Sequence, residues 1–477
     1  MIMASRSEFV RIWRKMVRRL SASRSDSPSD SASRNRLRHV MHLLTGNAAS
    51  MLIGLASVAL VARGLGPVEY GMLALTFSFT QAIERLVSFQ SWQPMIRYGA
   101  ELNTPEHHDD LKRLLKFGLM LDLAGAGAGW LIAIALTAAG GYLFGWDAET
   151  LRLVFIYSTV LLFTLTGMPT AVLRITGRFR TVAYGQVFSG LVRLAACVIA
   201  FVLKADLMTF ALVWMATQIV SSLTTLCMSF YVLHQEGIKG MLRAPLAGVA
   251  ERFPGLWKFT WSANISLTIW SSAQQFDTLI VGALAGPGEA GLYHIAKRVG
   301  RLAQQMGGQV QAVVYPEVSR LWASGAIVEF RRVVREVELL LVAAGIVGVV
   351  AMIFIAGPAI RFTAGPEFIA AAPLLIVQMM AMALTICGSV TRSALLAMGQ
   401  QQRVLHLVLI STAIFHATAL LLVPRIGAMG ANFAHIALGT TWLAGLLLVF
   451  RREVRKYPSG GSVPIGDAIP NVDPVTP

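Results

Sequence analysis

The sequence predicts an all-α integral membrane protein in which twelve transmembrane helices form two pseudo-symmetric six-helix lobes around a central cavity. Hydrophobic residues make up 55% of the 477 residues and charged residues only 14%, and the mean hydropathy is +0.62. A water-soluble core does not account for that composition. The other two observations are a set of apolar segments long enough to cross a bilayer and a turn motif that occurs twice.

The repeated turn motif is GPVEYG at residues 66–71 and GPGEAG at residues 286–291. Four of the six positions are identical, and the two copies are 220 residues apart. Glycine and proline end one helix and allow the next to begin, so each copy predicts a tight turn between two spans. Each copy is also followed by a proline and then an arginine, Pro94 with Arg97 and Pro316 with Arg320. We infer two parallel halves of one repeated unit.

The apolar segments give the predicted spans, because a helix needs about 20 residues to cross the hydrocarbon core. Twelve segments meet this requirement. They are residues 42–63, 71–93, 117–139, 153–173, 183–203, 207–231, 259–285, 291–315, 338–360, 372–391, 404–424 and 429–450.

The distribution of basic residues predicts the orientation of these spans. If the N-terminus is cytoplasmic, 31 of the 41 Lys and Arg residues lie in inner segments and only five in outer ones. The positive-inside rule then places both termini in the cytoplasm. The predicted parts of the chain are a basic cytoplasmic N-terminal tail (1–41), a first lobe (42–233), a cytoplasmic linker (234–257), a second lobe (258–450) and a cytoplasmic C-terminal tail (451–477).

Two features have alternative interpretations. In the N-terminal tail, basic residues alternate with Ile12, Trp13 and Val17, which fits either a helix on the membrane surface or a solvated tail that only fixes the orientation. The net charge of +16 would suggest nucleic acid in a soluble protein, but in a membrane protein orientation explains it, and no nucleic-acid partner is expected.

Enzymatic and metal chemistry find little support in the sequence. The three cysteines, Cys197, Cys227 and Cys387, all lie in apolar segments, and no metal-ligand cluster is present. We therefore expect no metal and no cofactor. The outer connections are short, so a membrane glycosyltransferase or polymerase would lack a domain to hold its acceptor.

The eighth predicted span carries an unusual stripe of polar side chains. They are His294, Lys297, Arg298, Arg301, Gln304, Gln305 and Gln309. Their spacing of three and four residues puts them on one face of a helix. Charged groups inside a membrane normally face protein or an aqueous cavity. Because the stripe carries three formal positive charges, it favours an anion such as a phosphate or pyrophosphate.

Asp277, in the seventh span, has two possible roles. It could form an ion pair with Lys297 or Arg298, since the seventh and eighth spans form one hairpin. Alternatively, it could bind a proton or cation that couples transport to an ion gradient. Glu84 is a similar candidate, with Arg85 as its local partner. Arg85 and Arg193 are further candidates for the lining of the cavity, although Arg193 could also extend toward the membrane surface.

Three segments together show a family resemblance. They are ARGLGPVEYG at residues 62–71, DTLIVG at 277–282 leading to GLYHIAKR at 291–298, and PRIGAMGA at 424–431. In this order they resemble bacterial polysaccharide flippases of the Wzx type. These belong to the superfamily of multidrug, oligosaccharidyl-lipid and polysaccharide exporters, and the likeness covers residues 42–450.

The resemblance implies two six-helix bundles around a V-shaped cavity and movement of an undecaprenyl-pyrophosphate-linked oligosaccharide from the cytoplasmic to the periplasmic leaflet. We therefore expect a non-enzymatic flippase for surface polysaccharide assembly, whether exopolysaccharide, O-antigen of lipopolysaccharide, or capsule. Lys297, Arg298 and Arg301 would hold the pyrophosphate, with membrane lipids and possible polymerase or export machinery as partners. The alternative is an ion-coupled small-molecule or multidrug antiporter of the same superfamily.

Overall fold

The structure is a computed structural model, and it describes residues 29–87, 91–100, 102, 104–144 and 147–457. These residues form helices and their connections, without a β-strand among them. The predicted basic helix in the first 20 residues lies outside the described part of the chain. Helix α2 begins at Ser29 and so extends into the segment predicted as a tail.

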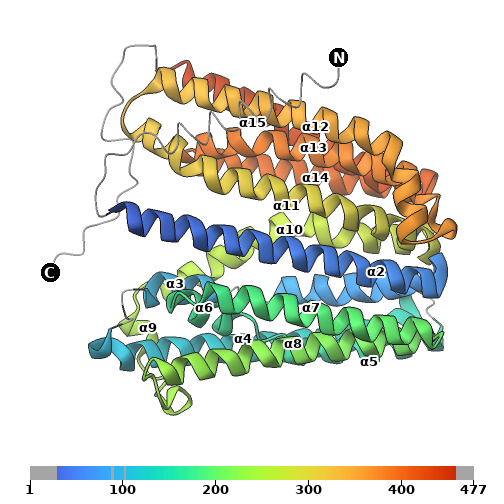
Figure 1. Ribbon diagram of the computed structural model, residues 1–477, viewed down its shortest axis with the longest axis horizontal. Coiled ribbons are helices and arrows are strands. Elements are labelled where there is room, and N and C mark those ends of the chain that lie inside the picture. The colour runs from blue at the N-terminus through green and yellow to red at the C-terminus, as the bar shows by residue number, and fades with distance from the viewer. Residues whose placement is uncertain (1–28, 88–90, 101, 103, 145–146, 458–477) are drawn as a thin grey trace.

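The helices run back and forth along the long axis of the molecule (Figure 1). The α-helices are α2 (Ser29–Val87), α3 (Trp92–Gly99), α4 (His108–Phe144), α5 (Ala148–Ser158), α6 (Gly167–Ile175), α7 (Phe179–Val202), α8 (Leu207–Gln235), α9 (Val249–Arg252), α10 (Leu256–Ala285), α11 (Pro287–Ala323), α12 (Ile327–Thr363), α13 (Ala371–Ala397), α14 (Gln401–Ile426) and α15 (Ala428–Val454). Short 3₁₀ helices occupy Pro105–His107, Thr159–Phe163, Met241–Arg243 and Pro366–Phe368.

Nine helices among the described residues are long and apolar enough to cross a membrane, so the chain is a multi-pass membrane protein. Helices α10 and α11 are not among the nine, and α11 carries the polar stripe. The fourth predicted span, residues 153–173, is not one continuous helix: it is divided between α5, the 3₁₀ helix and α6.

The two copies of the repeated turn have the same backbone conformation. Gly66 has φ 73° and ψ 175°, and Gly286 has φ 91° and ψ 169°. Only glycine adopts this region without strain. At Gly66 the chain of α2 reverses direction, as the blue ribbon in Figure 1 shows. We call the end of the molecule that holds both turns the twin-turn end.

The two turns also pack directly on each other, and they do so reciprocally. A Cβ atom added to Gly71 would overlap the carbonyl oxygen of Pro287, and one added to Gly291 would overlap the carbonyl oxygen of Pro67. Each copy therefore contacts the equivalent position of the other. This reciprocity gives the sequence repeat a physical role, because it joins α2 to α11 about a local pseudo-two-fold axis.

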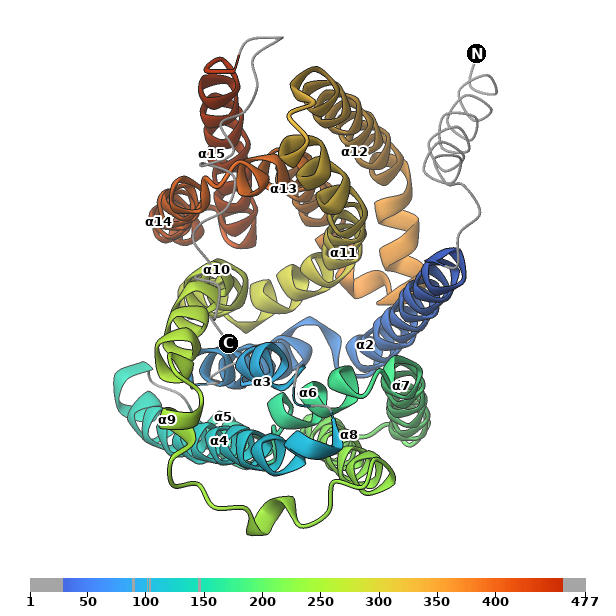
Figure 2. The same ribbon diagram turned by 90° about the vertical axis from the view of Figure 1, so that its left-hand side faces the viewer.

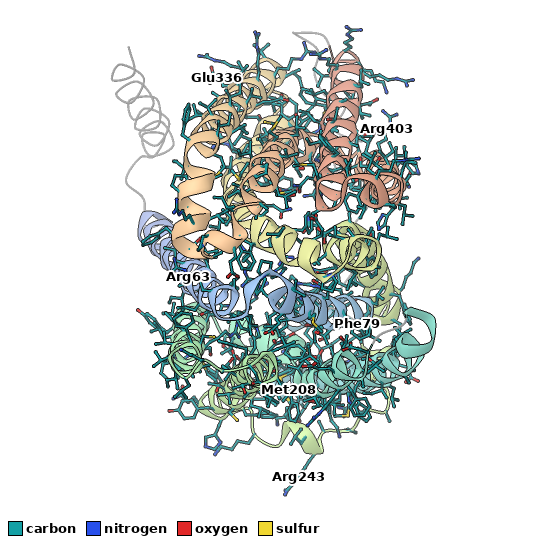
Figure 3. The ribbon with its side chains drawn as sticks, turned by 90° about the vertical axis from the view of Figure 1, so that its right-hand side faces the viewer. Arg63, Phe79, Met208, Arg243, Glu336 and Arg403 are labelled. Carbon is teal, nitrogen blue, oxygen red and sulfur yellow. The ribbon has the colours of Figure 1, made fainter. Side chains whose placement is uncertain are left out.

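Further contacts hold neighbouring helices at the twin-turn end. The Arg63 guanidinium donates hydrogen bonds to the carbonyl oxygens of Arg361, at 3.3 Å, and Phe362, and Figure 3 shows Arg63 where α2 approaches α12. Glu289, the fourth residue of the second turn motif, accepts a hydrogen bond of 2.8 Å from the backbone N–H of Ala428 at the start of α15.

Buried apolar side chains form one core at the twin-turn end and two at the opposite end. The largest cluster joins α2, α5 and α8 with α11 to α15. At the opposite end, one cluster joins α11 to α15 and a separate one joins α3, α4, α6, α8 and the start of α10. In the end-on view of Figure 2, α12–α15 lie on one side and α4–α8 on the other, with α2, α10 and α11 between them. The largest shared core of the described residues is thus at the twin-turn end.

The reciprocal glycine contact leads to a stability prediction. Gly71→Ala should lower the free energy of unfolding by about 1–3 kcal/mol, because the added methyl group meets backbone atoms that cannot rotate away. Thermal unfolding of the detergent-solubilised protein would measure the effect.

Gly288→Ala is the matched control, because its Cβ would lie 3.6 Å from a Val68 methyl group, an ordinary contact. Equal unfolding temperatures for the two variants would contradict the assigned role of Gly71.

Candidate polar site at the centre of the helical bundle

The polar stripe of α11 divides into two adjacent rows that face different neighbours. Tyr293 and Lys297 point toward α10, while Gln304 lines a small cavity of about 20 Å³ between α10, α13, α14 and α15. His294 and Arg298 point toward α2 instead: the His294 Nδ1 atom lies 2.6 Å from the Tyr70 hydroxyl oxygen. Sequence spacing identified one face of the helix, and the structure distributes that face between two interfaces.

Asp277 on α10 is the centre of the first row of contacts. It is fully buried and forms an ion pair with Lys297. Its other carboxylate oxygen, Oδ2, accepts a hydrogen bond of 2.8 Å from the Tyr293 hydroxyl and lies 3.1 Å from His435 Nε2 on α15. The backbone N–H of Thr278 donates to Oδ1 at 2.6 Å. The carboxylate is therefore fully enclosed by donors from three helices.

Lys297 uses its hydrogen-bonding capacity inside this cluster. Besides Asp277, its ammonium group donates to the carbonyl oxygen of Gln274 at 2.7 Å and to the Thr278 hydroxyl at 3.1 Å. An ammonium group has three donors, so all three are occupied. In this arrangement Lys297 neutralises Asp277, and an incoming phosphate would have to displace one of these partners.

Arg298 and Arg301 are placed differently from Lys297. Both side chains are half-buried, and within the described residues no carboxylate lies at ion-pair distance from either of them. The Arg298 guanidinium packs on Gly54 of α2, where an added Cβ would lie 3.5 Å from it. The like charges of Arg301 and Arg193 are close enough to repel Arg298. Three guanidinium groups from two helices thus share one region, which we call the arginine group (Arg193, Arg298 and Arg301).

Arg193 on α7 joins this group through α8. Its Nε atom donates to the Thr217 hydroxyl at 3.3 Å, and its guanidinium carbon lies 5.0 Å from the centroid of the Trp214 ring. A guanidinium over an aromatic face is stabilised without losing its charge. These two contacts direct the half-buried Arg193 side chain toward α8.

Glu84 and Arg85 are neighbours on α2, and the Arg85 charge acts on the Glu84 carboxylate, as the local pair suggested by the sequence requires. Arg85 is exposed, whereas Glu84 lines a small cavity of about 20 Å³ beside Asp122 of α4. Asp122 was not singled out from the sequence. Its carboxylate accepts hydrogen bonds from the Ser91 hydroxyl and, at 2.7 Å, from the backbone N–H of Met168, so it caps the start of α6 beyond the break in the fourth span.

Three other residues of the site were also missed in the sequence analysis. Tyr293 and His435 contact the Asp277 carboxylate, and Tyr70 contacts His294. An isolated histidine or aspartate within an apolar span is itself a signal, because such groups are costly in a membrane and are retained where they have a partner. Among the described residues no group of three or more His, Cys, Asp or Glu could hold a metal ion.

The buried ion pair gives a second prediction. Asp277→Asn or Lys297→Met alone should each destabilise the protein by about 3–5 kcal/mol, because each leaves one buried charge without its counter-charge. Replacing both should restore much of that loss. Thermal unfolding and the yield of monodisperse protein in detergent measure the effect, and a double variant less stable than either single one would contradict the pairing.

Known proteins resemble this chain in both sequence and structure. Residues 37–322 match the family described as "Polysaccharide biosynthesis protein". The inner membrane protein YghQ of Escherichia coli (strain K12) is 27% identical over 293 residues, which cover 61% of this chain and 82% of YghQ.

Two solved structures share the fold. An inward-facing multidrug resistance MATE family transporter of the MOP superfamily has a TM-score of 0.67 at 15% identity, covering 87% of this chain and 96% of the transporter. The lipid II flippase MurJ in an inward closed conformation has a TM-score of 0.65 at 14% identity, covering 87% of this chain and 89% of MurJ.

These matches confirm the resemblance based on the two turns and the PRIGAMGA segment. At this level of identity the solved structures establish the fold, and the family match covers more than half of the chain. The chain is therefore a multi-pass membrane protein with the fold of MurJ and the MATE transporters, and it belongs to the polysaccharide biosynthesis protein family.

Proposed function

We propose that this protein is a flippase that moves an undecaprenyl-pyrophosphate-linked oligosaccharide across the bacterial inner membrane for surface polysaccharide assembly. The observation that carries the proposal is the arginine group. Guanidinium groups bind phosphate oxygens in a forked geometry, and they do so more strongly where water is excluded. Arg298 and Arg301 would hold the pyrophosphate, with Arg193 and the exposed Arg85 as outer contacts.

Lys297 has a modified role in this proposal. Because Asp277 already neutralises it, Lys297 would reach the pyrophosphate only if the Asp277 cluster rearranged. Asp277, with His435 and Tyr293 beside it, would then respond to substrate or to a coupling ion. Glu84, next to Asp122, is the second candidate for coupling.

The architecture that supports transport is twelve crossings in two six-helix lobes around a central cavity. The crossings would be the two halves of α2, then α4, the α5–α6 segment, α7, α8 and α10 to α15. Three observations support the two lobes: the reciprocal contact of the twin turns, the separation of the two cores at the opposite end and the grouping of helices in Figure 2. The lobes would correspond to residues 42–233 and 258–450, joined by the linker 234–257.

The positive-inside rule supports an orientation with the twin-turn end in the periplasm and both tails, 1–41 and 451–477, in the cytoplasm. In that orientation the single core closes the periplasmic side and the divided cores face the cytoplasm, where lipid-linked oligosaccharides are made. The similarity to inward conformations of the MATE transporter and of MurJ agrees with this state. A polymerase or export machinery would take the product on the periplasmic side.

An ion-coupled antiporter of cationic drugs is the second candidate function, since MATE transporters share the fold. The positive charge of the arginine group disfavours it, because a cationic drug needs an acidic site. A glycosyltransferase or polymerase is less well supported still, because the family match and the structural neighbours give no example of such chemistry.

A complementation experiment tests the flippase proposal. In cells that lack the protein, lipid-linked oligosaccharide should accumulate facing the cytoplasm, and the wild type should relieve this accumulation. Arg298→Ala with Arg301→Ala should reduce the relief by at least about tenfold, because each charge-assisted hydrogen bond is worth about 1.5–3 kcal/mol. The leaflet distribution of the lipid-linked glycan is the measurement.

Arg335→Ala provides the matched control, since Arg335 is an exposed arginine on α12. It should insert and transport like the wild type. If the deletion causes no accumulation of glycan lipid but raises drug sensitivity, the antiporter replaces the flippase as the function.

A further inference from the structure

The repeated proline–arginine motif of the sequence has no role in the polar site. The structure places both copies at the end of the molecule opposite the twin turns. Arg97 is on α3, whose Met95 belongs to the core of the first half at that end. Arg320 is near the end of α11, whose Val318 belongs to the core of the second half. The two arginines therefore mark equivalent helix ends, on the side where the halves have separate cores.

Both arginines point away from the core of their own half. Each lies two residues after a buried core residue, which is a rotation of about 200° around the helix. Met95 is 1% exposed and Val318 is 0% exposed, whereas both arginines are exposed. The Arg97 guanidinium carbon lies 4.6 Å from the centroid of the Phe259 ring, on α10. Because α10 is the first helix of the second half, Arg97 faces that half across the boundary.

The offset between the two halves relates Arg97 to an acidic residue. Equivalent residues of the twin turns are 220 positions apart and meet each other: a Cβ atom added to Gly291 would lie 3.1 Å from the Cα atom of Gly71. The same offset relates Arg97 to Glu317, which precedes Arg320 by about one turn of α11. Residues near a two-fold axis contact their own equivalents. Closure of the opposite end about this axis would therefore bring together two equivalent residues of opposite charge.

Neither of these side chains is strongly held in the present conformation. Glu317 pairs with Arg320 of its own helix at 2.9 Å, and the two side chains are 28% and 66% exposed. An exposed pair of this kind stabilises little and exchanges readily. Within the described part of the chain, no carboxylate lies at ion-pair distance from Arg97, and a guanidinium over an aromatic ring keeps its charge. Both groups can therefore form a new pair without breaking a buried one.

We propose that Arg97 and Glu317 form an ion pair across the cytoplasmic side when the cavity opens to the periplasm, and we call this pair the cytoplasmic gate. The present structure corresponds to the open gate. Closure would exclude water from the pair, which strengthens the attraction between the charges. Arg320 would stay beside Glu317, so the carboxylate would be shared by one arginine from each half. The inference rests on the proposed function in requiring two alternately open states, and it adds the residues that hold one of them.

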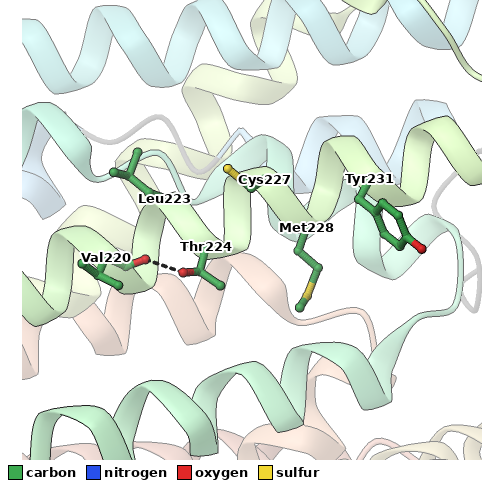
Figure 4. A pocket seen from close by; sticks show the side chains of 6 residues that line it. All are labelled: Val220, Leu223, Thr224, Cys227, Met228 and Tyr231. Carbon is green, nitrogen blue, oxygen red and sulfur yellow. Dashed lines mark hydrogen bonds between the residues drawn. The ribbon is translucent and has the colours of Figure 1, made fainter.

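A disulfide bond between the two positions tests the gate directly. The background carries Cys197→Ala, Cys227→Ala and Cys387→Ala; of the three native thiols, Cys227 is the exposed one, on α8 (Figure 4). Arg97→Cys and Glu317→Cys are added, and membranes that contain the protein are oxidised with copper phenanthroline. A disulfide needs Cβ atoms about 4 Å apart, so it forms only if α3 meets the end of α11.

Glu336→Cys in place of Glu317→Cys provides the matched control. Glu336 is also a glutamate that pairs with an arginine of its own helix, Arg332, at 2.8 Å. Figure 3 shows Glu336 at the outer edge of the second half, away from the first. The cysteines at 97 and 317 should give at least about tenfold more cross-linked protein than those at 97 and 336. Equal yields would overturn the inference.

Charge reversal gives an independent test. Arg97→Glu would place two carboxylates at the gate, and Glu317→Arg would place only arginines there. Each should reduce the relief of glycan-lipid accumulation at least about fivefold, because like charges oppose closure. The double reversal should restore transport to within about twofold of the wild type, and Glu336→Arg should leave it unchanged. A double variant no better than either single variant would reject the pair.

The cross-linking result and the flippase assay separate the two proposals. Cross-linking of positions 97 and 317 in a protein that moves no glycan lipid would reject the flippase and retain the gate. Transport of glycan lipid without cross-linking and without rescue by the double reversal would reject the gate and retain the flippase.

Discussion

The arrangement of the second half of the molecule depends on one buried charge. Asp277 has no exposed surface, and an isolated carboxylate in such a place would cost several kcal/mol. Its stability therefore requires Lys297 on α11, His435 on α15 and Tyr293 at their present positions. This requirement holds α10, α11 and α15 in register. That register also sets the direction in which the other polar residues of α11 face. Arg298 is directed toward α2 because Lys297 is directed toward α10.

Much of the fold could be predicted because the hydropathy of a span is averaged over about 20 residues, so single polar residues do not hide it. Most of the predicted apolar segments each lie on one observed helix, and the turns at Gly66 and Gly286 have the glycine-dependent conformation that their motif implies. The break in the fourth span could not be predicted in the same way. Gly167 and Pro169 follow the break directly and are its only local signal. What stabilises the start of α6 is Asp122, which is more than 40 residues earlier in the chain.

The candidate site was predictable in composition but not in pairing. Helical spacing predicted that Lys297, Arg298 and Arg301 share one face, and their charge suggested an anion. Spacing within one helix cannot show which residues of other helices meet it, so Asp277 had two possible partners and His435 had no assigned role. The structure resolves this because Lys297 and Arg298 are on adjacent rows, only one of which faces α10.

The reciprocal packing of the twin turns constrains how this protein can change over evolutionary time. Duplicated segments usually diverge independently, because each copy packs against different neighbouring residues. Here the two copies pack against each other: Gly71 contacts the backbone at Pro287, and Gly291 contacts the backbone at Pro67. A larger residue in one copy would therefore displace backbone atoms of the other copy. Substitutions in the two turns, which are 220 residues apart, should therefore be correlated across homologues.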